Sequence, residues 1–274
     1  MLNDILWPAI ALGGLGLLLG LGLAVASKVF AVKTDPNVEK VRDLLPGANC
    51  GGCGFPGCEG FAKAVAAGEI KPAACVALSA DGLKAIAEAL GVEAEEGEKN
   101  VARVLCSGGS ENCVPKYVYT GLHDCRAAAA LAGGPQSCKY GCVGLLTCAK
   151  ACPFGAIHLG KSGVAEIDED ICTGCGICAE ACPKKSIVVM PKDQQVFVRC
   201  HAPEKGKAVT VACKAGCIAC GICAKKCPEG AITMVGNLPV IDHDKCTGCG
   251  VCVAACPKKV IAGTPAVKEE PASK

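Results

Sequence analysis

The chain has 274 residues, of which 25 are cysteine and only 3% are aromatic, so metal or disulfide bonds must replace much of an ordinary core. This composition excludes a coiled coil, a collagen and a generically disordered chain, and the odd cysteine count argues against complete disulfide pairing. The formal charge of +2 gives no ground for a nucleic-acid partner, and cysteine-bound iron would make the protein acidic.

The N-terminal segment predicts a membrane anchor. Ile5 to Ser27 is a run of 23 residues without a charge, long enough to cross a bilayer as a helix. A cleaved signal peptide is the alternative, since Ala24-Val25-Ala26 resembles a cleavage site, but no Lys or Arg precedes the run and its length exceeds a signal core. Lys28 and Lys33 follow it, which favours a cytoplasmic location for everything after the helix. In that reducing compartment metal ligation explains the thiols better than disulfides do.

The first cysteine motif follows the anchor and has the spacing C-x2-C-x4-C-x16-C. Its members are Cys50, Cys53, Cys58 and Cys75. Glycines in the opening loop would let the backbone approach a cluster and offer N–H groups to its sulfurs. Zinc is the rival cofactor here. The segments 59–67 and 83–90 have the apolar spacing of helices.

Three later motifs share the spacing C-x2-C-x2-C-x3-C before a proline, and a fourth is a stretched copy of them. In chain order, the stretched motif and the regular ones are Cys138, Cys142, Cys148 and Cys152; Cys172, Cys175, Cys178 and Cys182; Cys217, Cys220, Cys223 and Cys227; and Cys246, Cys249, Cys252 and Cys256. Four consecutive cysteines that end in Cys-Pro favour iron–sulfur clusters over zinc.

The motifs form two pairs, and the cysteine before each proline is expected to bind the cluster of its partner motif. The expected sets are Cys138, Cys142, Cys148 with Cys182; Cys172, Cys175, Cys178 with Cys152; Cys217, Cys220, Cys223 with Cys256; and Cys246, Cys249, Cys252 with Cys227. Together with the first motif, this predicts five [4Fe–4S] clusters, with iron as the metal.

Five cysteines fall outside these sets. They are Cys106, Cys113, Cys125, Cys200 and Cys213. Two interpretations stay open: buried packing thiols, or a sixth iron–sulfur site built from Cys106, Cys125, Cys200 and Cys213, with Cys113 as the spare thiol.

The overall prediction is an α+β chain: a transmembrane helix, a small iron–sulfur domain and two tandem two-cluster repeats with β-α-β order. Short strands are expected around 156–159, 164–167, 231–234 and 238–241. The predicted parts are an anchor (1–30), a four-cysteine domain (34–92), a linker with extra cysteines (93–135), a first two-cluster domain (136–190), a connecting segment (191–213), a second two-cluster domain (214–263) and a disordered tail (264–274).

These motifs carry two resemblances. Residues 136–190 and 214–263 each resemble a bacterial two-cluster ferredoxin, a family that transfers single electrons. The order of anchor, four-cysteine domain and ferredoxin pair resembles the B subunits of Rnf-type electron transport complexes, although simple members have one ferredoxin pair. The resemblance implies a subunit of an ion-translocating ferredoxin:NAD oxidoreductase, with no complete catalytic site on this chain.

The partners implied by the resemblance are the other membrane and peripheral subunits of the complex, and soluble ferredoxin as electron donor. No nucleotide fingerprint is present, so no nucleotide is expected to bind directly. The expected location is the cytoplasmic membrane, with a single pass and the clusters on the cytoplasmic side. Alternative functions are an electron-transfer subunit of another membrane redox enzyme, such as a hydrogenase, or a cluster carrier for assembly.

Overall fold

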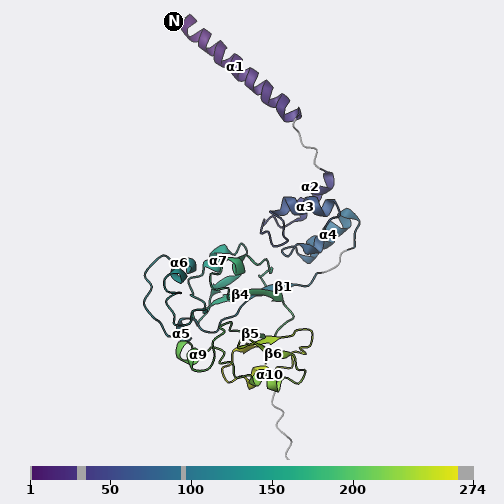
Figure 1. Ribbon diagram of the computed structural model, residues 1–274. Coiled ribbons are helices and arrows are strands. Elements are labelled where there is room, and N and C mark those ends of the chain that lie inside the picture. The colour runs from purple at the N-terminus through teal and green to yellow at the C-terminus, as the bar shows by residue number, and fades with distance from the viewer. Residues whose placement is uncertain (1, 30–34, 94–96, 265–274) are drawn as a thin grey trace, which may run out of the picture.

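The computed structural model describes residues 2–29, 35–93 and 97–264 (Figure 1). Lys33 of the predicted anchor flank and residues 265–274 of the predicted tail lie outside these ranges. The described parts follow one another in space roughly as they do in sequence. A long helix leads to a small helical domain, then to a first and a second unit of short strands and helices.

Helix α1 (Leu2–Val29) stands apart from the rest of the chain in Figure 1. Among the described residues it is the one helix long and apolar enough to cross a membrane, and none of its most apolar window, Leu12–Val29, is buried against other parts of the chain. Lys28 lies in its last turn. A helix whose leucines have no protein partner needs an apolar environment from elsewhere.

The small domain contains three α-helices and a single 3-10 turn: α2 (Pro36–Leu44), α3 (Cys58–Ala66), η1 (Pro72–Ala74) and α4 (Ala80–Leu90). The helices predicted at 59–67 and 83–90 are therefore confirmed. Ser79 caps α4 by accepting a hydrogen bond from the Gly82 amide at 3.1 Å. Val41, Phe61 and Ile86 form the buried centre of the domain.

Each of the next two units contains an antiparallel hairpin at the predicted place. The hairpins pair β2 (Ile157–Leu159) with β3 (Ala165–Ile167), and β6 (Ile232–Val235) with β7 (Leu238–Ile241). Four one-turn helices carry the third cysteine of each motif: α7 (Thr147–Ala151), α8 (Ile177–Ala181), α10 (Ile222–Lys226) and α11 (Val251–Ala255). The fourth cysteine of each motif is the residue that ends its helix.

The outer strand pair of each unit begins upstream of the predicted domain boundaries. In the first unit β1 (Asn100–Val104) pairs with β4 (Ile187–Pro191), and in the second β5 (Phe197–Val198) pairs with β8 (Ile261–Ala262). The segments 93–135 and 191–213 therefore each supply a strand to a ferredoxin-like unit. Cysteine spacing does not reveal these strands because they carry none of the motif cysteines.

The remaining segments, 105–136 and 199–216, are paired with each other around Cys106 and Cys113. They contain the short helices α5 (Gly109–Asn112), α6 (Cys125–Ala130) and α9 (Lys207–Ala212). Two isolated antiparallel bridges join them, Cys106 to Cys200 and Cys113 to Cys213. The Lys214 amide also donates to the Asn112 carbonyl at 2.9 Å. We call this paired region the junction.

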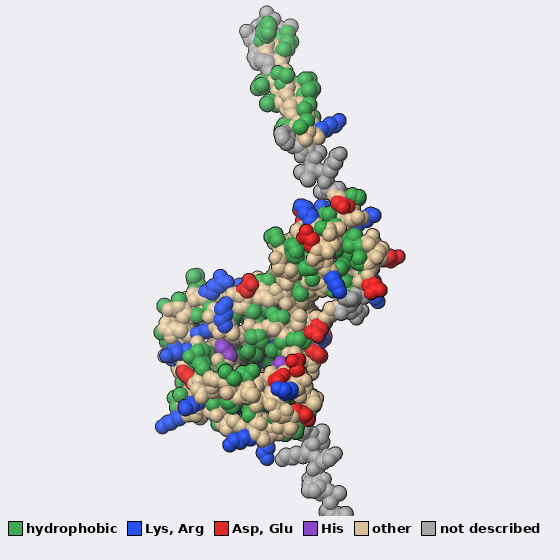
Figure 2. All heavy atoms as spheres, turned by 45° about the vertical axis from the view of Figure 1, so that its right-hand side comes forward, with side chains coloured by type: hydrophobic (Ala, Val, Ile, Leu, Met, Phe, Trp, Pro, Cys, Tyr) green, Lys and Arg blue, Asp and Glu red, His purple; other side chains and the backbone are tan. Residues whose placement is uncertain are grey.

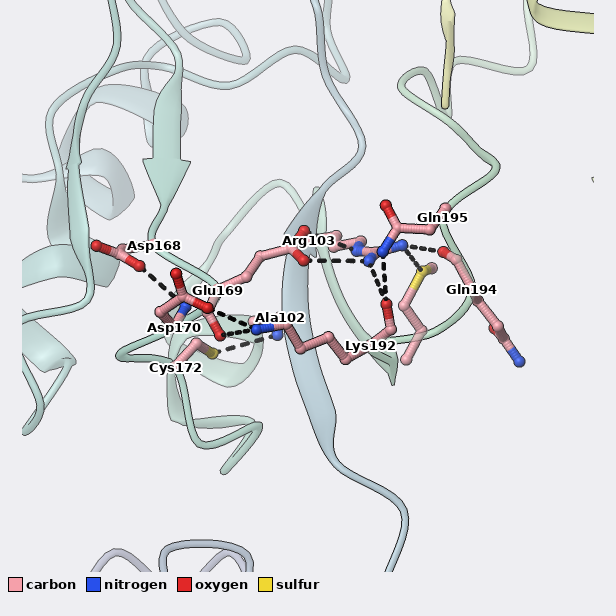
Figure 3. A network of polar contacts seen from close by, with 10 residues as sticks. Ala102, Arg103, Asp168, Glu169, Asp170, Cys172, Lys192, Gln194 and Gln195 are labelled. Atoms are coloured by element: carbon pink, nitrogen blue, oxygen red, sulfur yellow. Dashed lines mark hydrogen bonds and ion pairs between the residues drawn. The ribbon is translucent and has the colours of Figure 1, made fainter. Parts of the chain in front are cut away.

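Arg103 fastens the first unit to the strand that leads into the second. Its side chain is only 3% exposed and forms an ion pair with Glu169 at 3.1 Å. It also donates to the carbonyls of Lys192 and Gln194 (Figure 3), and its guanidinium stacks 4.7 Å from the centre of the Phe197 ring. These contacts fix the direction in which β4 continues toward β5.

Candidate metal centres

The first site lies in the loop before α3. Four thiols line one cavity there: Cys50, Cys53, Cys58 and Cys75. Gly51 and Gly54 adopt φ values of +73° and +86°, which other residues rarely tolerate. The Asn49 side chain accepts a hydrogen bond from the Cys58 amide at 2.9 Å, and this bond closes the loop around the four thiols.

This site abuts the first ferredoxin-like unit at Gly52. A Cβ atom placed on Gly52 would come within 3.0 Å of both the Cα and the Cβ of Cys175. Only glycine permits that approach between two cysteine-bearing loops. The helical domain is thus in contact with the first unit at one of the unit's motif cysteines.

Replacing Gly52 with valine is expected to weaken the contact between the two loops by about 1–3 kcal/mol, because the new side chain must displace backbone atoms. The iron content should stay unchanged. Backbone amide hydrogen exchange over 172–178 should become faster, whereas Ala67→Val, at an exposed position of the same domain, should leave it as it is. Unchanged exchange in the Gly52 variant would contradict the contact.

The second unit brings its cysteines together in crossed sets. One cavity is lined by Cys217, Cys220, Cys223 and Cys256, and another by Cys227, Cys246, Cys249 and Cys252. In the first unit, Cys178 has three thiols as its charged neighbours: Cys152, Cys172 and Cys175. These three groupings have the same members as the sets expected from the motif spacing.

The stretched motif differs from the expected grouping. The cavity that contains Cys142, Cys148 and Cys182 is completed by Cys125, not by Cys138. Cys138 instead lines the cavity of the junction. The spacing explains the difference, since five residues rather than two separate Cys142 from Cys148. Cys125, from another segment, lines the Cys142 cavity in place of Cys138.

Asp124 and Thr147 hold Cys125 in that place. The Asp124 carboxylate caps α6 by accepting from the Arg126 and Ala127 amides, and it accepts from the Thr147 hydroxyl at 3.1 Å. The Thr147 hydroxyl oxygen accepts in turn from the Cys125 amide at 2.6 Å. Asp at the start of an Ala-rich segment was the available sequence signal for this helix start.

The junction cavity gathers the thiols that are left. It is lined by Cys106, Cys113, Cys138, Cys200 and Cys213. The sixth site expected from Cys106, Cys125, Cys200 and Cys213 therefore has three of its members in one place, and Cys125 lies elsewhere. Hydrogen bonds from the Cys113 thiol lower the pKa of Cys138 to about 6 and that of Cys213 to about 7.

Several buried motif thiols hold their protons more tightly than a free thiol when no metal is bound. Burial raises the pKa of Cys142 to about 11 and those of Cys148 and Cys178 to about 12, with neighbouring thiolates adding to the shift of the latter two. Metal ligation requires thiolates, so loading these sites must release protons.

The cavities suit a cluster better than a single metal ion. No group of three or more His, Cys, Asp or Glu side chains in the described ranges converges closely enough to hold one ion. Zinc needs four ligands at one centre, whereas a cubane spreads its four cysteines over four irons. The thiols line the walls of shared cavities, and this arrangement fits iron–sulfur clusters.

Family models match the same segments. A model described as "Putative Fe-S cluster" matches residues 45–77. A model described as "4Fe-4S dicluster domain" matches 136–186 and 216–260, and a second model with that description matches 171–232. The N-terminal half of the junction, including Cys106, Cys113 and Cys125, lies outside all of these matches.

Three relatives align with most of the chain, and each is the B subunit of an ion-translocating complex. That of the Na⁺-translocating ferredoxin:NAD⁺ oxidoreductase complex of Acetobacterium woodii is 48% identical, and the alignment covers 89% of this chain and 74% of the relative. That of the proton-translocating ferredoxin:NAD⁺ oxidoreductase complex of Clostridium ljungdahlii is 43% identical over 88% of this chain and 85% of the relative. That of the ion-translocating oxidoreductase complex of Methanosarcina acetivorans is 42% identical over 89% and 93%. With identities of 42–48% to these three subunits over most of its length, the chain belongs to the family of B subunits of Rnf-type ion-translocating oxidoreductase complexes.

Proposed function

We propose that this chain is the iron–sulfur electron-transfer subunit of an ion-translocating ferredoxin:NAD oxidoreductase complex. Two tandem two-cluster units follow a four-cysteine domain, and these parts hold five [4Fe–4S] clusters. The observation that carries the proposal is the series of cysteine-lined cavities that runs through the described chain from the helical domain to the second unit.

The ligands of the five clusters follow the groupings in space. They are Cys50, Cys53, Cys58 and Cys75; Cys152, Cys172, Cys175 and Cys178; Cys125, Cys142, Cys148 and Cys182; Cys217, Cys220, Cys223 and Cys256; and Cys227, Cys246, Cys249 and Cys252. A bound cluster of this type supplies the ability to accept and release one electron. The chain contributes the thiolates, a dry surrounding and backbone N–H donors to sulfur, such as the Ala102 amide 3.3 Å from Cys172 (Figure 3).

Neighbouring sites are linked through the protein. In each two-cluster unit the fourth cysteine of one motif serves the partner site, so the two sites share a one-turn helix. The four-cysteine domain meets the first unit at the contact between Gly52 and Cys175. Such contacts keep each electron transfer short, and the chain therefore suits stepwise transfer of electrons along its length.

Electrons enter most easily at the second unit. Of the 25 cysteines only Cys220 and Cys249 are exposed, and both belong to that unit. Its clusters are therefore the closest to a soluble partner. The four-cysteine domain lies at the opposite end, on the side of α1 (Figure 1).

The second unit is also basic. Residues 217–264 contain five lysines and three acidic residues, and the adjoining junction segment 200–216 adds three lysines and one acidic residue. In Figure 2 blue side chains border the lower end of the molecule, where this unit lies. A positive surface around an exposed cluster attracts an acidic electron carrier and speeds its encounter. We assign this surface to soluble ferredoxin, the donor in the proposed reaction.

Reversing two of these charges tests the assignment. Lys225→Glu with Lys226→Glu, in the last turn of α10, should raise the KM for reduced ferredoxin by about tenfold at low ionic strength, and salt should reduce the difference. The measurement is ferredoxin-dependent NAD reduction by the assembled complex. Lys161→Glu, an exposed change of the same sign in the first unit, should have little effect. Equal effects of the two changes would place the donor elsewhere.

Helix α1 is the proposed anchor and the contact to the membrane subunits. It spans the cytoplasmic membrane once, and Lys28 at its end favours the cytoplasmic side for the clusters. Gly16 and Gly20 lie one turn apart, and a Cβ added to either would meet no other part of the chain. A helix of a neighbouring subunit could approach closely there.

A further inference from the structure

The junction cavity is as large as the cluster sites and is built from thiols that none of the five clusters uses. Its open volume is ≈ 420 Å³, compared with ≈ 360 Å³ for the cavities lined by Cys142 and by Cys217. The family models that cover the other sites leave its first half unmatched. Size and lining both suit one more cubane.

Four of the five thiols accept backbone hydrogen bonds of a kind that also occurs at the other sites. In the other sites Cys75, Cys142, Cys175 and Cys217 each accept a bond from the amide two residues later. Four junction thiols accept the same bond, which comes from Gly108, Tyr140, Ala202 and Ala215, to Cys106, Cys138, Cys200 and Cys213 respectively. Amide donors to sulfur are typical of cluster ligands.

Cys113 differs from these four. The strongest contacts of its sulfur are hydrogen bonds with the thiols of Cys138 and Cys213. In a cubane each cysteine binds a different iron, so ligand sulfurs are not in direct contact with one another. Cys113 is therefore a neighbour of the ligands rather than one of them.

Polar side chains hold the backbone beside three of the four thiols. His201 contacts the Leu105 carbonyl at 2.9 Å, Lys184 donates to the Lys139 carbonyl at 2.6 Å, and Lys258 donates to the Lys214 carbonyl at 2.8 Å. Each of these carbonyls belongs to a residue adjacent to a junction thiol. The Ser107 hydroxyl in the same wall is buried without a hydrogen-bond partner. A sulfur-rich cluster in the cavity would supply an acceptor for it.

We propose that the junction binds a sixth [4Fe–4S] cluster through the thiolates of Cys106, Cys138, Cys200 and Cys213. The inference rests on the proposed function, since it takes the same cofactor for the same purpose. Four thiols lose their protons as they bind four irons, and the cluster then gains one electron when one neighbour is oxidised and returns it when the other is reduced.

The position of this site makes it the link between the two units. The Cys106 sulfur accepts a hydrogen bond from the Cys142 amide at 3.4 Å, next to a site of the first unit. The Cys200 sulfur accepts one from the Cys217 amide, next to a site of the second unit. Without the sixth cluster, electrons would have to cross the junction in one step.

Iron and acid-labile sulfide per chain test the proposal in the full-length protein, purified without oxygen. The wild type should contain about 24 irons, Cys213→Ser about 20, and Cys113→Ser about 24. Cys200→Ser should match Cys213→Ser. In the reduced proteins, the paramagnetic signals of the other five clusters should persist in both variants, which shows that the chain still folds.

A double substitution separates the new grouping from the one expected from spacing. If Cys138 and Cys142 serve different clusters, Cys138→Ser with Cys142→Ser should remove about eight irons, whereas a shared cluster would lose about four. About 20 irons in the wild type, with no change in Cys213→Ser or Cys200→Ser, would overturn the sixth site and leave the proposed function intact. A loss of nearly all iron in both variants would count against a discrete cluster. A wild type with zinc and little iron would overturn the proposed function itself.

Discussion

Cys182→Ala should remove the cluster of Cys125, Cys142 and Cys148 and spare the one bound by Cys172, Cys175 and Cys178. The Cys182 sulfur is buried in the cavity of the former set and lies 3.3 Å from the Ser186 hydroxyl. The expected loss is about four irons per chain, although the substituted residue belongs by sequence to the latter motif. Iron analysis and the paramagnetic spectrum of the reduced protein measure it.

Pairs of substitutions reveal which cluster is lost. Cys182→Ala with Cys142→Ala should lose no more iron than either change alone, because both remove the same cluster. Cys182→Ala with Cys172→Ala should lose about eight. Cys152→Ala is the matched control. With Cys172→Ala it should lose no more iron than either change alone, and with Cys142→Ala it should lose about eight irons. The opposite pattern would show that each motif binds its own cluster.

Removing residues 1–30 should move the protein from the membrane to the soluble fraction with its iron retained. None of the apolar window of α1 is buried in the chain, so its loss exposes no core. Ferredoxin-dependent NAD reduction by the complex should fall to background, because the chain no longer meets its membrane partners. The measurements are cell fractionation, iron content and activity of the reassembled complex.

Gly16→Leu with Gly20→Leu is the matched control for that deletion. This variant keeps an apolar helix and should stay in the membrane, but it should lose association with the complex if a partner helix packs on these glycines. A mature N-terminus at Ser27 in the intact protein would show instead that α1 is removed as a signal, and would contradict the anchor.

The sequence predicted the helices and the hairpins because each has a local cause. The apolar spacing of 59–67 and 83–90 is visible in one segment, and so are the short apolar runs beside the motifs. The strands β1 and β5 were not predicted, because each is short and pairs with a distant partner. Asn100 faces Pro191, and Phe197 faces Ala262, and no local pattern encodes such a pairing.

The grouping of the cysteines was predictable to the extent that the spacing was regular. The three regular motifs curl in a fixed way, so their groupings follow from sequence separation. The stretched motif lacks this regularity, since three residues follow Cys138 and five follow Cys142 where the regular motifs have two. What the sequence could not provide was the replacement, because Cys125 reaches its cavity through side-chain contacts between Asp124 and Thr147.

The pairing of β1 with β4 also determines when the first unit can fold during synthesis. Because Asn100 pairs with Pro191, the first unit cannot close until the chain has emerged past residue 191. At about 5–20 residues per second, that takes roughly 5 to 20 s after β1 appears, and the thiols that share a core with both strands, such as Cys142 and Cys172, lack that cover until then. Iron and sulfide can be delivered to them during this interval. Oxygen that reaches the nascent chain in the same seconds would meet the same unprotected thiols.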